Sequence, residues 1–198
     1  MLSEIKSEIA SLAARLIVEE GLEYGAAKRR AAKSLKISGR ADLPGNEDVE
    51  DAVRDYLAVF RADTQPAELL ALRRLALLWM DRLAVFRPYL SGAVWLGTAT
   101  RLSDICLQLF CDDCKSAEMT LIDQQVSYVA RSVTGFHGEV VGALSVHAFC
   151  TDLQEEIGVH LMIYDHDDVR GALKPDAKGR APRGDIQALR RLLGKVSS

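Results

Sequence analysis

Apolar residues in the first forty positions recur at steps of three and four, the spacing that places them on one face of an α-helix. The first run of this kind ends before Gly21, a residue type that favours the left-handed conformation found just after helices. The run consists of Leu2, Ile5, Ile9, Leu12 and Leu16. A second helix is predicted over residues 24–37. The pattern therefore predicts that the chain begins with two amphipathic helices.

Two further helices are predicted before residue 87. Residues 39–46 read GRADLPGN and are predicted to form a loop because of their glycines and proline. Asn46 is then the predicted N-cap of a helix that carries apolar residues as far as Phe60. After a break at residues 63–66, a longer helix over 66–86 is apolar on more than one face. We expect it to be the most buried helix and to pack under a sheet.

Alternation of apolar and polar residues predicts strands in the second half of the chain. In residues 104–110, every second side chain shares one face of the strand and the others are buried on the opposite face. The first face carries Asp104, Cys106, Gln108 and Phe110. A helix over 112–125 is predicted to follow, and then strands over 126–133, 140–148 and 159–164. A hairpin turn at 135–138 is predicted to join the first two of these strands. The chain is then predicted to continue with a flexible basic segment over 171–184 and a helix over 185–193.

Helices followed by a mixed sheet with flanking helices predict an α/β (α+β) protein. The expected organisation is a helical N-terminal region, residues 1–86, and an α/β region, residues 87–198, in one compact unit. The 198 residues are enough for one substantial core, and 48% of them are apolar, as in globular proteins. The net charge of −3 argues against a protein that coats nucleic acid along its whole surface.

The cellular compartment is predicted from features that the sequence does not contain. A run of about twenty apolar residues, as a membrane-spanning helix needs, is not present. The N-terminal residues MLSEIKSEI include acidic residues and lack the continuous apolar stretch of a secretion signal. The four cysteines are therefore expected to be reduced thiols, and the sequence predicts a cytoplasmic protein without a membrane partner.

Basic residues are concentrated in the second predicted helix. Between residues 21 and 40, six basic side chains accompany one acidic side chain, a local net charge of +5. One interpretation is a face that contacts the phosphates of a nucleic acid or nucleotide. The other is a solvated helix surface close to the acidic stretch that follows. The second is favoured, because no aromatic residues that could stack on bases lie among the basic ones.

The stretch from Gly92 to Phe110 reads GAVWLGTATRLSDICLQLF. Its spacing resembles the signature of the nucleotidyltransferase-fold, polymerase-beta-like superfamily, in which Gly-Ser is followed by a second glycine and then by Ser-Asp-x-Asp. The matching positions are Gly92, Gly97, Ser103, Asp104 and Leu107. The resemblance implies a nucleotidyltransferase-like sheet in which Asp104 is a catalytic metal ligand. The nucleotide-binding positions that it implies are Gly92, Ala93, Gly97, Thr98 and Ser103.

The chain departs from this signature where the chemistry would take place. Ala93 occupies the position of the serine that touches the triphosphate in the superfamily. Leu96 occupies a position that is arginine in many members, and Cys106 occupies the position of the second metal-binding aspartate. The strand expected to carry a third carboxylate reads GVHLMIY and places His160 there. Nucleotidyl transfer uses two divalent cations about 4 Å apart, and a thiol suits magnesium poorly. We therefore expect a degenerate magnesium site without conventional catalysis.

Acidic residues elsewhere could restore a metal site if the fold brought one of them close to Asp104. The candidates are Asp152, Asp165, Asp167 and Asp168. Asp165 is the first of these to test, because it directly follows the strand that carries His160. The cluster at residues 165–168 also has a purely structural interpretation as a turn whose carboxylates cap the next segment, and this interpretation is favoured.

The cysteines offer a rival site. A Cys-x-x-Cys pair and a His-x-x-Cys pair supply the ligand types of a tetrahedral zinc site. The four residues are Cys111, Cys114, His147 and Cys150. The first pair lies at a strand-to-helix junction and lacks the glycines of a zinc knuckle, and free cysteine is common as a small apolar residue. The sequence therefore favours ordinary thiols over zinc ligands.

Other catalytic signatures are missing from the sequence. It contains no phosphate-binding loop of the form Gly-x-x-x-x-Gly-Lys-Ser/Thr, no Gly-x-Gly-x-x-Gly and no Gly-x-Ser-x-Gly. The chain also resembles a set of uncharacterised bacterial proteins that share GTAT-x-x-SD, an LPGNEDVE-like loop and YDHDD-x-RGAL. Some of these are labelled UDP-N-acetylmuramate–alanine ligase. Such a ligase is much larger and needs the missing phosphate-binding loop, which argues against that activity.

Three functions remain as alternatives. The first is a non-catalytic nucleotide-binding protein with a regulatory or scaffold role that keeps a cleft between the Gly92 turn and Asp104. The second is an active magnesium-dependent enzyme that moves a nucleoside monophosphate to a small molecule, protein or RNA. The third is a partner-binding module that uses the fold only as a scaffold. Nucleotide binding separates the third from the others, and magnesium-dependent turnover separates the second from the first.

Overall fold

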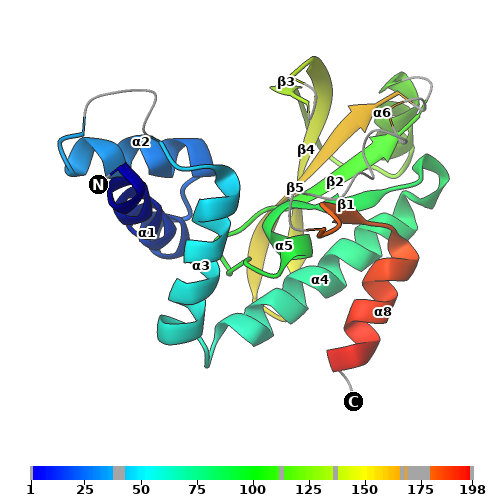
Figure 1. The fold of residues 1–198 in the computed structure, drawn as a ribbon. Coiled ribbons are helices and arrows are strands. Elements are labelled where there is room, and N and C mark those ends of the chain that lie inside the picture. Colours follow the sequence, from blue (N-terminus) through cyan, green and yellow to red (C-terminus); the bar gives the residue numbers. More distant parts are fainter. Residues whose placement is uncertain are drawn as a thin grey trace. The chain divides into compact units, whose positions relative to one another are not determined.

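Three helices make up the N-terminal part of the computed structural model, which describes residues 2–37, 43–111, 114–135, 138–165, 168 and 179–196 (Figure 1). They are α1 (Leu2–Glu20), α2 (Tyr24–Ser34) and α3 (Asn46–Phe60). Their common core is rich in alanine and valine, small side chains that allow the helices to pack closely. Its buried members are Ile9, Ala10, Ala13, Ala14, Val18, Ala27, Ala31, Ala32, Val49, Val53 and Leu57. The predicted helices are confirmed.

The ends of two of these helices test the capping predictions. α1 stops at Gly21, which has a φ of +69° and donates its N–H to the Ile17 carbonyl at 3.0 Å, as predicted. The N-cap of α3 is Gly45, one residue before the predicted Asn46. The reason is that the Asp48 carboxylate accepts the Gly45 N–H at 2.9 Å, so the helix is capped from within its first turn.

The basic residues of α2 contact neighbouring parts of the same unit. The Lys28 ammonium donates to the Asn46 side chain at 2.9 Å and to the Pro44 carbonyl at 3.2 Å. The Arg30 guanidinium forms an ion pair with Glu20 of α1. These contacts favour the interpretation of α2 as a solvated helix surface.

The chain divides into two compact units, residues 1–67 and 68–198. The sequence analysis placed the boundary at residue 86 and expected one compact unit. The long helix α4 (Gln65–Arg82) was assigned to the helical region, but its apolar side chains belong to the core of the second unit. Leu72, Ala76 and Met80 of α4 are completely buried there. A short 3₁₀ turn, Ala84–Phe86, then leads into the sheet.

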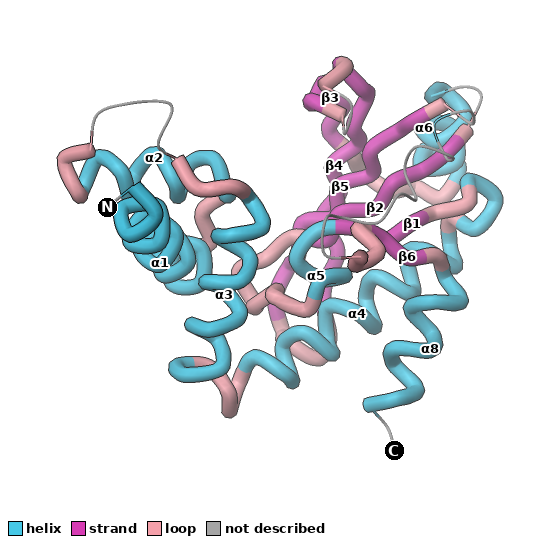
Figure 2. The backbone as a smooth tube through the Cα atoms, in the orientation of Figure 1, coloured by secondary structure: helices cyan, strands magenta, loops and turns pink. Residues whose placement is uncertain are grey.

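The second unit contains one mixed sheet with the spatial order β3-β4-β5-β2-β1-β6 (Figure 2). Its strands are β1 (Tyr89–Ser91), β2 (Ile105–Phe110), β3 (Val129–Thr134), β4 (Val140–Cys150), β5 (Glu155–Tyr164) and β6 (Arg183–Gly184). β2 and β5 are parallel, and the other neighbours are antiparallel. The mixed α/β class is thus confirmed.

Helices α4, α6 (Cys114–Asp123) and α8 (Ile186–Val196) contribute to a core on one face of this sheet. The predicted alternation of β2 is confirmed, because Ile105, Leu107 and Leu109 enter this core. The opposite face of β2 carries Asp104, Cys106, Gln108 and Phe110. The prediction that the long helix packs under the sheet is also confirmed.

Two short strands, β1 and β6, were not predicted by the sequence patterns. Residues 183–184 were predicted to be part of a flexible segment, yet they form β6 and pair with β1. Trp95 explains this pairing, because its indole N–H donates to the Ala181 carbonyl at 2.8 Å and its ring lies on Gly184. A Cβ atom at Gly184 would lie 2.1 Å from the ring, so only glycine allows this approach.

Some predicted features lie outside the described residues. These are residues 38–42 of the first loop, residues 136–137 of the hairpin turn with His137, residues 166–167 of the acidic cluster, and residues 171–178 of the basic segment. Within the described part of the chain, no helix is both long and apolar enough to cross a membrane.

Candidate functional site

Three segments that carry candidate residues meet at one edge of the sheet. β1 ends at Ser91, which lies opposite Cys106 near the start of the antiparallel strand β2. β5 runs parallel to β2, and its residue His160 also lies opposite Cys106. The turn at Gly92, the residue Asp104 and the beginning of β5 therefore share the same edge. This edge is the candidate functional site.

The Gly92 turn is held by its own backbone conformation and by helix α4. Gly92 has a φ of +69° and begins the short helix α5 (Gly92–Leu96); a Cβ at this position would lie 3.8 Å from Cβ of Cys106. At the other end of α5, the Arg73 guanidinium donates to the carbonyls of Val94 and Trp95, both at 3.1 Å. Burial lowers the pKa of Arg73 from its ordinary value, but an arginine remains charged.

The residues between the Gly92 turn and Asp104 have structural roles. The Ala93 carbonyl accepts the N–H groups of Gly97, Thr98 and Ala99 at 2.9 to 3.2 Å. Thr98 is 3% exposed, so its side chain is not available to a ligand in this conformation. The Ser103 hydroxyl accepts the Thr100 N–H at 3.1 Å and closes the turn before Asp104. Of the five implied nucleotide-binding positions, Ser103 directly precedes Asp104 in the chain, and Gly92 lies next to Cys106 of β2.

The turn before Asp104 is fixed by residues of α4 and β5. The Arg101 N–H donates to the Glu68 carboxylate of α4 at 3.0 Å. The Arg101 guanidinium pairs with Glu155, the first residue of β5. Because Glu68 and Glu155 both lie in regular secondary structure, these contacts hold the turn, and with it Asp104, in one position at the sheet edge.

Asp104, His160 and Ser145 form a hydrogen-bonded row across three strands. His160 Nε2 lies 3.0 Å from Asp104 Oδ2, and His160 Nδ1 lies 2.9 Å from the Ser145 hydroxyl. An ionised carboxylate only accepts hydrogen bonds, so Nε2 carries the proton that is donated to Asp104. In the neutral imidazole, Nδ1 then accepts the Ser145 hydroxyl proton. Both ring nitrogens are thus engaged, which fixes the orientation of His160.

This row has the composition of a Ser-His-Asp hydrolase triad but the opposite exposure. In a triad the serine faces the substrate and the aspartate is buried. Here Ser145 is only 7% exposed, whereas the side chain of Asp104 is 54% exposed. Ser145 therefore orients His160, and Asp104 is the group that a ligand reaches.

The electrostatic environment favours the ionised form of Asp104. The hydrogen bond from His160 contributes most to lowering its pKa below the ordinary value. Partial burial opposes this effect, while charge interactions with His160 and His147 and the Gly158 N–H add to it. Asp104 is therefore a stable carboxylate anion, suited to a cation more than to proton abstraction.

Replacing His160 by phenylalanine is expected to raise the pKa of Asp104, because the largest stabilising contact of the carboxylate is lost. A lowered pKa stabilises the folded state above the unfolded pKa of about 3.9, and this contribution is lost as the pH falls through the folded pKa. The carboxyl ¹³C shift of Asp104, followed against pH, measures the change. His147→Phe is the control, with a smaller rise expected; equal rises in both variants would contradict this account.

The positions of the expected magnesium site hold one carboxylate, one thiol and one imidazole. Asp104 supplies one carboxylate, and the positions across the strand pair hold Cys106 and His160. Within the described residues, no group of three histidine, cysteine, aspartate or glutamate side chains is arranged to bind a metal ion. A single carboxylate fits a magnesium ion that arrives with a triphosphate. Two ions held by the protein would need further carboxylates.

Asp165 does not lie near Asp104. It follows the last residue of β5, whereas Asp104 lies beside Gly158 near the beginning of that strand. At about 3.3 Å per residue, the two positions are roughly 20 Å apart, so they cannot bind the same ion. Of the other acidic candidates, Asp152 pairs with Arg74 at 3.1 Å. The Asp168 N–H donates to the Asp165 carbonyl at 3.1 Å, as in a turn.

The four zinc candidates are also separated. The Cys111 N–H donates to the Tyr164 carbonyl at the end of β5, while His147 lies opposite Gly158 near its beginning. These two residues are at opposite ends of the strand and cannot share one ion. Among the described residues, Cys111 and Cys150 are not joined in disulfide bonds, and the side chain of Cys114 lies outside the described residues.

Three residues of the site were not identified from the sequence. Ser145 lies in an alternating strand without a motif, and Arg73 lies in a helix among many apolar residues. Gly158 had a recognisable signal, since an isolated glycine within a strand often marks a close approach of another group. A Cβ at Gly158 would lie 2.6 Å from Asp104 Oδ1, which shows that the glycine makes room for the carboxylate.

Comparison with known proteins gives no assignment for this site. No family model, no curated protein and no solved structure matches the chain.

Proposed function

We propose that the chain is a nucleotidyltransferase-like protein with degenerate catalytic carboxylates that binds a nucleotide without transferring it, as a regulatory or scaffold protein. The observation that carries the proposal is the Asp104–His160 hydrogen bond of 3.0 Å. An imidazole stands where a further carboxylate would be needed, and it already binds Asp104. One accessible carboxylate supports binding of a magnesium nucleotide, while transfer requires a pair of ions.

The surroundings of Asp104 support the same proposal. The Gly92 turn reaches the same sheet edge, where a Cβ atom at Gly92 would be in ordinary van der Waals contact with Cys106. In the superfamily that the sequence resembles, the corresponding turn holds the triphosphate. Within the described part of the chain, Cys106, Cys111 and Cys150 are not joined in disulfide bonds, which fits a reducing compartment such as the cytoplasm.

An active magnesium-dependent transferase is the second candidate. It is favoured by the lowered pKa of Asp104, because an ionised carboxylate is what a catalytic metal ion needs. This candidate predicts release of pyrophosphate in the presence of magnesium and an acceptor, whereas the first predicts binding alone.

Calorimetric titration of the full chain with ATP, GTP, CTP and UTP, each with and without magnesium, tests the proposal. We expect at least one nucleotide to bind with magnesium, and Asp104→Asn to weaken that binding at least tenfold, because the amide removes the negative charge. A pyrophosphate assay on the same samples should give no signal above the Asp104→Asn background.

Asp165→Asn is the matched control, since it removes the same charge at the other end of β5. Its affinity should equal that of the unmodified chain. Absence of binding to all four nucleotides would overturn both nucleotide functions and leave the partner-binding alternative. Pyrophosphate release that depends on Asp104 would instead establish the transferase.

A further inference from the structure

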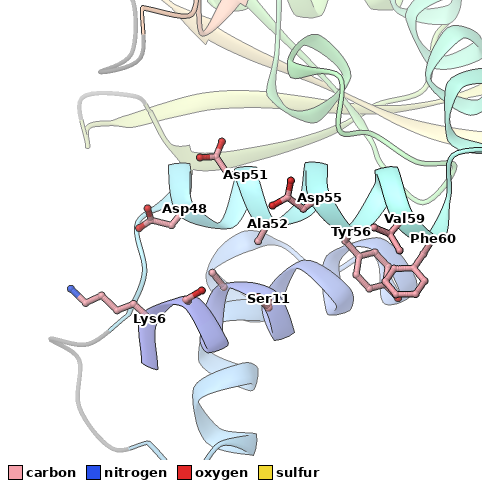
Figure 3. Close-up of a pocket in the computed structure, with 11 residues that line it drawn as sticks. Lys6, Ser11, Asp48, Asp51, Ala52, Asp55, Tyr56, Val59 and Phe60 are labelled. Carbon is pink, nitrogen blue, oxygen red and sulfur yellow. The ribbon is translucent and has the colours of Figure 1, made fainter. Parts of the chain in front are cut away.

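A groove of about 630 Å³ runs between α1 and α3 within the N-terminal unit. Its apolar lining comes from Ala10 on α1 and from Ala52, Tyr56, Val59 and Phe60 on α3. Figure 3 shows the rings of Tyr56 and Phe60 lying together at the C-terminal end of α3. Their centroids are 4.6 Å apart. The groove therefore has an aromatic platform at one end.

Tyr56 is partly buried against the core of the unit, whereas Val59 and Phe60 at this end are not part of it. The core face of α3 consists of Val49, Val53 and Leu57. Val59 and Phe60 point elsewhere and are 71% and 65% exposed. Neighbouring large apolar side chains that remain in water are typical of a binding surface.

Acidic side chains line the rest of the groove along α3. Asp48, Asp51 and Asp55 follow one another at steps of three and four, so they form one stripe on the helix (Figure 3). Lys6 is the single basic residue among the lining residues that the structure describes. Three carboxylates against one ammonium give the groove a net charge of −2, although the adjacent helix α2 is basic.

We propose that this groove binds a basic amphipathic helix of a partner protein. Along α3 the three carboxylates are separated by about 4.5 and 6 Å, since each residue rises 1.5 Å. A helix lying along the groove presents lysine or arginine residues at i, i+3 and i+7 with the same separations. Apolar residues one turn further along the bound helix then reach the Tyr56–Phe60 platform. An apolar anchor and complementary charges are the features of helix-in-groove recognition.

The probe for this proposal is a fluorescent alanine-based helical peptide with arginines at i, i+3 and i+7 and two leucines one turn beyond. The control peptide has the same composition, with its arginines distributed around the helix. Fluorescence anisotropy with the full-length chain should show binding of the patterned peptide at least tenfold tighter than of the control. Binding should weaken as salt is added, because charge pairs carry part of it.

Two variants separate the charge and apolar contributions. Asp51→Asn combined with Asp55→Asn should weaken peptide binding at least tenfold, and Phe60→Ala should do so independently. Asp63→Asn, outside the groove, should have no effect. Circular dichroism checks that each variant keeps its helices.

The proposal is overturned by any of three results. The first is equal binding of the two peptides, which would mean attraction between net charges only. The second is a patterned peptide that does not bind, or binds all variants equally. The third is self-association of the chain in light scattering that is lost in Phe60→Ala, which would make a second copy the occupant. None of these results depends on nucleotide binding.

Discussion

Replacing Leu161 by alanine is expected to destabilise the α/β unit by about 2–5 kcal/mol, the usual range for a leucine truncated in a closed core. Leu161 is completely buried in β5, between β2 and β4, and belongs to the core shared with α4. The space that it leaves is bounded by strands on both sides and cannot collapse easily. Because domains are typically stable by only 5–15 kcal/mol, a large part of the stability is at stake.

Urea unfolding followed by tryptophan fluorescence measures this effect. Both tryptophans of the chain, Trp79 and Trp95, lie in the α/β unit, so the signal reports on that unit. Leu78→Ala on α4 is the control; Leu78 is 67% exposed, and a change within about 0.5 kcal/mol is expected. Similar unfolding midpoints for the two variants would show that Leu161 is not part of a closed core.

The fold was predictable where a periodic pattern coincides with burial. β2 buries the residues that its period of 2 selects. Of the stripe predicted for α1, Ile9 is fully buried, and Ile5, Leu12 and Leu16 are partly buried against the same core. The glycine after α1 has the expected conformation. The division after residue 67 differs from the expected boundary, because α4 was grouped with the helices that precede it although it was already expected to pack under the sheet. The β6 strand was missed, since its pairing depends on Trp95, a residue far away in the sequence.

The candidate site was predictable only in part. The sequence assigned Asp104 and His160 to one metal site only through the resemblance to the superfamily, and the structure brings them together at 3.0 Å. The order of strands decides this, because it places β5 next to β2 in parallel, and no local pattern encodes that order. The same strand direction separates Asp165 from Asp104, although both adjoin strands of the predicted sheet.

The sequence also could not predict which side chains of the Ser145–His160–Asp104 row are buried and which are exposed. A serine, a histidine and an aspartate in proximity usually suggest nucleophilic catalysis. Burial of Ser145 and exposure of Asp104 reverse the roles, which makes the row a support for one carboxylate. The tertiary structure, and not the residue types, therefore decides what the site presents to a ligand.

Substitution of Gly158 by alanine is expected to break the hydrogen bond between His160 and the Asp104 carboxylate. The new Cβ would lie 2.6 Å from Oδ1 and 2.8 Å from Cγ of Asp104, far closer than atoms can approach. These atoms are not the free end of a flexible chain, because His160 and the Gly158 N–H bind the carboxylate. Asp104 must therefore rotate away and lose the bond to His160, at a cost of about 1–3 kcal/mol.

Two measurements follow the effect of Gly158→Ala. Urea unfolding should show the loss of stability, and the pKa of Asp104 from ¹³C titration should rise toward the ordinary value. Gly142→Ala on the adjacent strand is the control, because a Cβ there meets no atom within 4 Å. Replacing a strand glycine in open space should be neutral or stabilise by about 0.5–1 kcal/mol. If Gly158→Ala instead behaved like Gly142→Ala, the carboxylate would not be held against β5, and nucleotide binding at Asp104 would lose its structural basis.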